Sequence, residues 1–131
     1  MTDQEFLDAF FSGTLPNEQF HHRDHLRLTW LTLRRHGRGL GSRMLADGIR
    51  HFAAGHGQAS RYQETMTQFW IRLVDHARRA RPDVASFEEF VAAFPLVLDK
   101  TLPFRHWNRD TMMSPDARAA WLEPDLKSLG F

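Results

Sequence analysis

Three histidines within five residues make His21-His22-Arg23-Asp24-His25 the densest polar cluster of the chain. If a helix includes His21, then His21 and His25 are four residues apart and share one helical face. Two imidazoles on one face are able to bind a metal ion such as zinc, iron or copper. If the helix begins later, His22 or His25 caps it and Asp24 favours its positively polarised end. The alternative interpretation is that these histidines are packed, hydrogen-bonded structural residues.

A second polar cluster lies around Tyr62 and Glu64. Tyr62 is the only tyrosine of a chain that contains 11 phenylalanines, which suggests a use for its hydroxyl. Glu64 lies two residues from both Tyr62 and Met66, which are predicted to face inward, so we expect Glu64 at the edge of the core. A half-buried carboxylate near a histidine has a raised pKa or orients the imidazole. The alternative is an ordinary first-turn glutamate that the helix dipole stabilises.

His106 belongs to a third group, which lies in or near the stretch between the prolines at 103 and 115. The pattern predicts irregular chain over residues 103–110. Irregular segments held over a helical scaffold often carry function. His106 is able to complete a three-ligand set with the histidines at 21–25. The alternative is a structural role. The other polar or aromatic members of this group are Asp99, Arg105, Trp107 and Asn108.

The run of arginines and glycines at residues 34–43 is a candidate phosphate loop. It lacks the G-x-x-x-x-G-K-[ST] pattern, and no strand is predicted before it. Gly37, Gly39 and Gly41 with their basic neighbours can still hold an anion at a helix start, although a flexible connection explains them too. Residues 21–61 carry eight Arg and two Asp, whereas the whole chain has a net charge of +1, which counts against nucleic-acid binding.

The elements that must position these residues are helices. Leu and Ala number 28 and Val and Ile only 6 among 131 residues, which predicts an all-α chain with an aromatic-rich core in one domain, residues 1–131. Apolar spacing and capping signals predict five or six helices. The main ones are expected at 3–12, 22–36, 42–54, 61–80, from a capping box at 86–89 to 94, and from 114 to before 121. Short turns are expected at 17–20, with Asn17 as a cap, and at 96–102, and a surface tail at 126–131.

Several classes of protein are excluded. The chain has no cysteine, so it has no disulfide, thiolate zinc site, iron–sulfur cluster or cysteine nucleophile. The absence of disulfides and an acidic start, Met1 to Glu5, without an apolar signal-peptide core predict a cytoplasmic protein. No apolar run approaches the roughly 18 residues of a membrane span. The G-x-S-x-G motif of serine hydrolases is absent as well.

Several segments together resemble those of a group of small uncharacterised bacterial proteins. They are Phe20 to Leu28, Trp30 with Arg34-Arg35, Tyr62 to Thr67, and Glu123 to Leu126. The resemblance covers most of the chain and implies a bacterial, single-domain, helical protein, with no activity attached. In that group the second segment usually reads Tyr-His-Glu-Thr, and Gln63 stands here in place of its histidine. If that histidine is a ligand, this chain has a weaker or different site.

The leading hypothesis is a small-molecule site between the helices at 22–36 and 61–80, in a binding protein or a small enzyme, with or without a divalent metal. Its predicted catalytic groups are His22, His25 and Glu64, its ligand-binding residues Trp30, Tyr62, Phe69, Trp70 and His106, and its metal ligands His21, His25 and Glu64. The alternative is a non-catalytic interaction or scaffold domain, in which the histidines are structural. Self-association is compatible with both.

Overall fold

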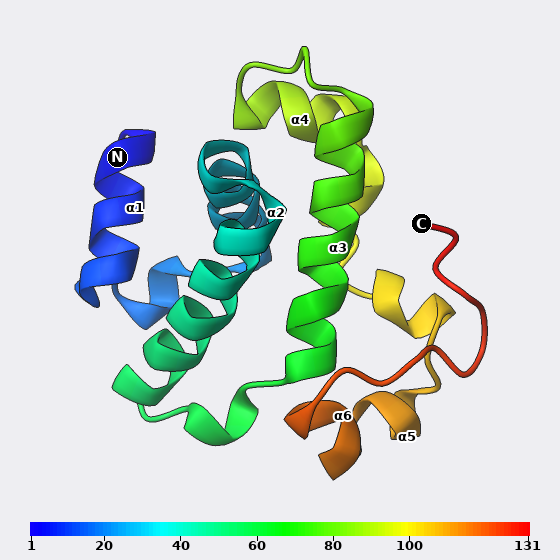
Figure 1. Ribbon diagram of the computed structural model, residues 1–131. Helices are drawn as coiled ribbons and strands as arrows, with labels where there is room; N and C mark the ends of the chain where they lie inside the picture. Colours follow the sequence, from blue (N-terminus) through cyan, green and yellow to red (C-terminus); the bar gives the residue numbers. More distant parts are fainter. The chain divides into compact units, whose positions relative to one another are not determined.

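Helix is the only regular secondary structure, as the composition predicted. The computed structural model describes residues 1–131 and holds six α-helices, four short 3₁₀ helices and no strand (Figure 1). The α-helices are α1 (Asp3–Ser12), α2 (His22–Gly55), α3 (Glu64–Ala80), α4 (Phe87–Ala93), α5 (Arg109–Met112) and α6 (Pro115–Ala119). The 3₁₀ helices are η1 (Asn17–Gln19), η2 (Ala59–Arg61), η3 (Pro95–Leu98) and η4 (Leu102–Arg105). None of the helices has the length and apolar character needed to cross a membrane.

The chain divides into two compact units, Met1–Tyr62 and Gln63–Phe131. The first holds α1 and α2, and the second holds α3 to α6. Each has buried aromatic side chains of its own, which confirms the aromatic-rich interior. They are Phe6, Phe10, Trp30 and Phe52 in the first unit, and Phe69, Phe87, Phe90 and Trp107 in the second. A single domain over residues 1–131 stays a prediction.

Helix α1 has the predicted bounds because strong local signals mark both of its ends. The Thr2 hydroxyl accepts a hydrogen bond from the Glu5 backbone N–H (3.1 Å), and the Glu5 carboxylate accepts one from the Thr2 N–H (2.9 Å). This reciprocal pair satisfies N–H groups that a helix start leaves without partners. Gly13 ends the helix at φ 80°, a conformation that glycine adopts without strain. The predicted apolar face buries Phe6, Leu7 and Phe10, whereas Phe11 is exposed.

Helix α2 bends sharply at Gly37. The sequence predicted separate helices at 22–36 and 42–54 with all three glycines between them, but only Gly37 leaves helical geometry, at φ 77° and ψ 175°. The second stretch of α2 begins directly after it, so the prediction was wrong for Gly39 and Gly41, which are helical. Figure 1 shows the two stretches as separate coils that meet at this bend. A Cβ on Gly41 would lie 3.2 Å from Leu33 Cδ2, so a glycine there allows the stretches to approach closely.

These glycines give a matched test of the bend. Gly37→Ala is expected to cost about 1–3 kcal/mol of unfolding free energy, because its backbone conformation is one that essentially only glycine adopts. Gly39→Ala is expected to be neutral or to stabilise by up to about 1 kcal/mol, since Gly39 is helical and a Cβ there meets nothing within 4 Å. Urea unfolding followed by circular dichroism measures both, and equal effects of the two changes would contradict the bend.

Helix α1 packs against the second stretch of α2 at another glycine. A Cβ on Gly48 would lie 3.0 Å from both the Phe10 and the Phe11 ring, so a glycine there allows the two helices to approach closely. Arg27, on the first stretch, forms an ion pair with Asp3 at 2.7 Å. The short turn after α1 was predicted correctly, but its cap was not. Residue 17 is inside η1, and no side chain caps that element.

Helix α3 begins at Glu64, three residues later than predicted. Gln63 is its N-cap, and the Gln63 side-chain oxygen accepts a hydrogen bond from the Met66 N–H (3.0 Å). The sequence did not predict that α3 buries a carboxylate. Asp75 is 1% exposed and pairs with Arg78 at 2.5 Å. Burial of a charge is tolerated only with such a partner.

The second half of the second unit is more ordered than expected. Ser86 caps α4 as predicted, with its hydroxyl accepting from the Glu89 N–H (3.1 Å), but the Glu89 carboxylate accepts from the Ala85 N–H instead of completing the box at Ser86. The predicted turn at 96–102 corresponds to η3. The prediction of irregular chain over residues 103–110 was wrong, because η4 and the start of α5 occupy most of that segment.

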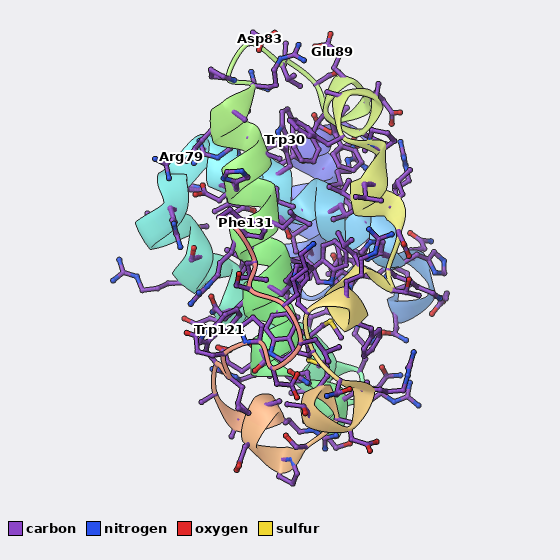
Figure 2. The ribbon with its side chains drawn as sticks, turned by 90° about the vertical axis from the view of Figure 1, so that its right-hand side faces the viewer. Trp30, Arg79, Asp83, Glu89, Trp121 and Phe131 are labelled. Carbon is purple, nitrogen blue, oxygen red and sulfur yellow. The ribbon has the colours of Figure 1, made fainter.

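The C-terminal segment lies on the second unit as an irregular strip. Figure 2 shows Trp121 and Phe131, near its two ends, beside α3. The Arg72 guanidinium lies 3.7 Å from the centroid of one Trp121 ring, and the His76 and Phe131 rings stack at 5.0 Å. Residues 125–131 are exposed except Leu129, so the predicted surface tail is confirmed.

Asp125 fastens this strip to the start of α5. Its carboxylate accepts hydrogen bonds from the Asn108 N–H (2.9 Å), the Asn108 amide and the Thr111 hydroxyl. The bonds from Thr111 and Asn108 hold the pKa of Asp125 below its ordinary value. The Glu123 to Leu126 segment thus has a structural role in this chain.

Candidate functional site

The predicted histidine cluster lies at the start of α2, within the first unit. His21 is the N-cap of the helix, in extended conformation, and its backbone N–H donates to Asp24 Oδ2 at 2.9 Å. Asp24 therefore sits in the first turn, as predicted for a helix that begins after His21. The prediction that His22 or His25 caps the helix was wrong, because the N-cap is His21. The helix does not include His21, so the condition for a helical pair of His21 and His25 is not met. The His21 side chain is exposed, whereas His25 is half-buried.

His25 is part of a group of closely packed aromatic rings. Its imidazole lies 3.9 Å from the centroid of the Phe20 ring, at an interplanar angle of 31°. Phe20 in turn contacts Phe10 (5.0 Å) and Phe52 (4.8 Å). Burial among these rings, together with the smaller effect of the nearby charge of His22, lowers the pKa of His25 to about 4. His25 is therefore neutral at pH 7.

A neutral, half-buried imidazole has a definite chemistry. One ring nitrogen carries a proton and donates, and the other accepts a hydrogen bond or ligates a metal. A group with a pKa near 4 is a weak general base at neutral pH, because proton transfer is most efficient when the pKa is near the working pH. His25 is thus better suited to accepting a hydrogen bond from a ligand than to removing a proton.

Sequence reasoning missed His56, which lies at the end of α2 in the same aromatic group. Its imidazole is 4.4 Å from the centroid of Phe52, and its Nε2 lies 3.2 Å from the Leu15 carbonyl oxygen. Since a carbonyl only accepts, Nε2 carries the proton and donates. The spacing of four residues from Phe52 is the signal that could have placed His56 beside that ring.

Glu64 and Tyr62, the other predicted polar groups, are placed by separate elements. Glu64 opens α3 in the second unit, and its Oε1 accepts a weak hydrogen bond from Gln68 at 3.5 Å. Tyr62 precedes the helix and belongs to the first unit, where the Arg50 guanidinium lies 4.8 Å from its ring centroid. Whether Glu64 joins the histidines of α2 stays a prediction.

Gln63 has both ends of its side chain engaged. Its oxygen caps α3, as described above, and its Nε2 donates to the Met112 carbonyl. Gln63 thus anchors the start of α3 to α5.

The predicted ligand-binding residues have mixed environments. Trp30 is 2% exposed, with the Arg34 guanidinium over its ring at 4.9 Å, and Phe69 is 0% exposed. Phe69 packs in a cluster with Leu102, Trp107 and Met112, and Trp70 lies partly buried against it. These side chains are packing residues of their units, and their role as walls of a ligand site stays a prediction.

His106 is held in one orientation in the second unit. Its Nδ1 lies 2.9 Å from the Lys127 carbonyl oxygen, so Nδ1 is the protonated nitrogen and Nε2 is the acceptor. Its backbone carbonyl accepts from the Leu126 N–H at 2.9 Å, so ring and backbone both hold the C-terminal strip. The ring lies 5.8 Å from Phe69.

No group of three or more histidine, aspartate or glutamate side chains is arranged to hold a metal ion. The predicted metal ligands His21, His25 and Glu64 therefore have no support from the structure. No protein-family model, curated protein or solved structure matches the chain. Function is accordingly inferred from the chain's own side chains.

Proposed function

We propose that the chain is a small-molecule-binding protein whose recognition site is formed by His22 and His25 at the start of α2. The observation that carries the proposal is the neutral His25 imidazole packed among phenylalanine rings. Ligand sites are typically apolar with a few polar groups that fix orientation. The aromatic group supplies the apolar component, and the two imidazoles supply the polar one.

The chemistry of these groups defines a class of ligand. A flat, apolar molecule with one hydrogen-bond donor fits best, because it stacks on the rings and donates to the acceptor nitrogen of His25. His22, three residues away on the same helix and half-buried, is placed to make a second polar contact. If the site is catalytic, the low pKa of His25 means that this residue orients the substrate rather than removing a proton from it.

Phenol and Zn²⁺ are two probes that separate an organic ligand from a metal. We expect phenol to shift the His22 and His25 ring resonances saturably in NMR spectra of the full chain at pH 7. His25→Phe keeps a ring on Phe20 but removes the acceptor, so it should abolish the shifts. His51→Phe, which changes an exposed histidine of the same helix, should leave them intact.

Two outcomes would overturn the proposal. One is the absence of a saturable shift with either probe. The other is the same response in His25→Phe as in the unsubstituted chain, since the acceptor nitrogen would then be irrelevant. A response to Zn²⁺ alone would assign the site to a metal and reject the organic ligand.

A further inference from the structure

We propose that the arginines around the Gly37 bend of α2 bind the phosphate backbone of nucleic acid. The surface, here called the elbow surface, consists of Arg34, Arg35, His36, Arg38 and Arg43. All five side chains are exposed. Four of them lie within five consecutive residues, and three of those four are arginines. The proposal does not depend on a small-molecule site at His25.

The bend makes these residues project from the first unit. Residues 34–36 and 38–40 are all exposed, whereas Leu33 and Gly41, at the base of the bend, are buried. The contact between Gly41 and Leu33 brings the two stretches of α2 together just below the bend. The non-helical conformation at Gly37 bends the chain there, and exposed basic side chains lie on both sides of the bend.

The type of cation on this unit favours phosphate. All eight Lys or Arg residues of Met1–Tyr62 are arginines, and the two lysines of the chain are Lys100 and Lys127. The planar guanidinium donates two parallel hydrogen bonds to a phosphate, which a lysine ammonium cannot do. No acidic residue occurs between Asp24 and Asp47.

Contacts within the unit orient two of the arginines. The Arg34 guanidinium lies over Trp30, and Arg35 Nη1 donates to Gln4 Oε1 at 2.9 Å. Gln4 also donates to Asp8 at 2.8 Å, so one carboxylate lies beyond the amide that Arg35 contacts. Pre-positioned side chains lose less conformational entropy on binding than free ones do.

Nucleic acid fits the elbow surface better than an anionic membrane does. An interfacial helix binds a bilayer through a continuous apolar face. At the bend the only exposed large apolar side chain is Leu40, at 48%. The net charge of +1 argued against nucleic acid, but attraction is governed by charges within about one Debye length of the phosphates, about 10 Å at 0.1 M salt. We therefore expect weak, salt-sensitive binding.

Fluorescence anisotropy of the full chain with a labelled mixed-sequence DNA duplex tests the proposal. With four arginines in contact, the slope of log affinity against log salt is expected to be about −3 to −4. The triple variant Arg34→Ser/Arg35→Ser/Arg38→Ser should flatten this slope by about 3 and weaken binding at low salt by more than about tenfold. Arg38→Gln/Arg43→Gln, which leaves the Trp30 and Gln4 contacts in place, should flatten it by about 2 and serves if the triple variant unfolds.

A matched control separates the elbow surface from net charge. Arg105→Ser/Arg109→Ser/Arg118→Ser removes the same charge from exposed positions of the second unit and should leave the slope nearly unchanged. Equal losses in both triple variants, or no salt-dependent binding at about 20 mM salt, would overturn the proposal. So would binding to phosphatidylserine vesicles without binding to DNA, which would assign the surface to a membrane.

Discussion

Acidification from pH 7 to pH 4 is expected to remove up to about 3 kcal/mol of unfolding free energy through His25 alone. The pKa of His25 is about 4 in the folded chain, against an ordinary value of 6.5. Between these values the unfolded chain binds a proton that the folded chain does not. The contribution is therefore complete above pH 6.5 and is lost progressively as the pH falls toward 4. For a domain with a stability of about 5–15 kcal/mol, this is a large fraction.

Comparison with His25→Phe isolates this effect from the protonation of carboxylates. Urea unfolding at a series of pH values between 7 and 4 gives the free energy for each chain. Between pH 7 and pH 4 the His25→Phe chain should lose up to about 3 kcal/mol less unfolding free energy than the unsubstituted chain, because a phenylalanine ring does not titrate. His51→Phe, at an exposed position, should follow the unsubstituted chain. Identical pH profiles for His25→Phe and the unsubstituted chain would mean that His25 is not buried as described.

The elements with strong local signals were those the sequence could predict. Helix α1 has its predicted bounds because the signals that define it, the apolar face and Gly13, lie within a few residues of one another in the sequence. The bend of α2 shows the limit of such signals. Gly37, Gly39 and Gly41 are the same residue type in one short run, and what distinguishes them is packing. Only Gly37 has a positive φ, and only Gly41 lies against Leu33.

The residue types of the candidate site could be predicted from the sequence, but the protonation state of His25 could not. The spacing of His22 and His25 was visible in the sequence, and so was their place at a helix start. The low pKa of His25 was not, because it depends on Phe20 and on Phe52, which is 27 positions further along the chain but lies in the same ring group. Trp30 and Phe69 are both buried, and their role as walls of a ligand site stays a prediction.

Residues 103–110 were predicted to be irregular because prolines and polar residues interrupt any apolar period there. Order in this segment comes from distant partners. Asp125 accepts hydrogen bonds from Asn108, and the Trp107 indole donates to the Leu122 carbonyl at 3.0 Å. Such contacts join residues about 15 positions apart, so no local pattern reports them. They also make Trp107 a central residue of the second unit.

Trp107→Ala is expected to cost about 3–5 kcal/mol of unfolding free energy, the largest effect of any single change considered. Trp107 is 0% exposed and lies edge-to-face with Phe69 (5.6 Å) and Trp121 (5.5 Å). Alanine leaves a cavity between these rings and removes the hydrogen-bond donor to the Leu122 carbonyl. Because the C-terminal strip depends on that bond and on the packing of Trp121, the strip should detach before the rest of the unit unfolds. Amide hydrogen exchange at residues 122–127 measures the detachment, and urea unfolding measures the cost.

Two further variants divide this cost between packing and hydrogen bonding. Trp107→Phe keeps a ring in the cluster but has no indole N–H, so it should lose less than alanine does and still speed exchange in the strip. Trp121→Ala removes a partly buried ring whose Nε1 donates to the nearby Glu123, and it should cost less than Trp107→Ala. If Trp107→Ala costs no more than Trp121→Ala, then the cluster around Phe69 does not depend on Trp107 as its packing implies.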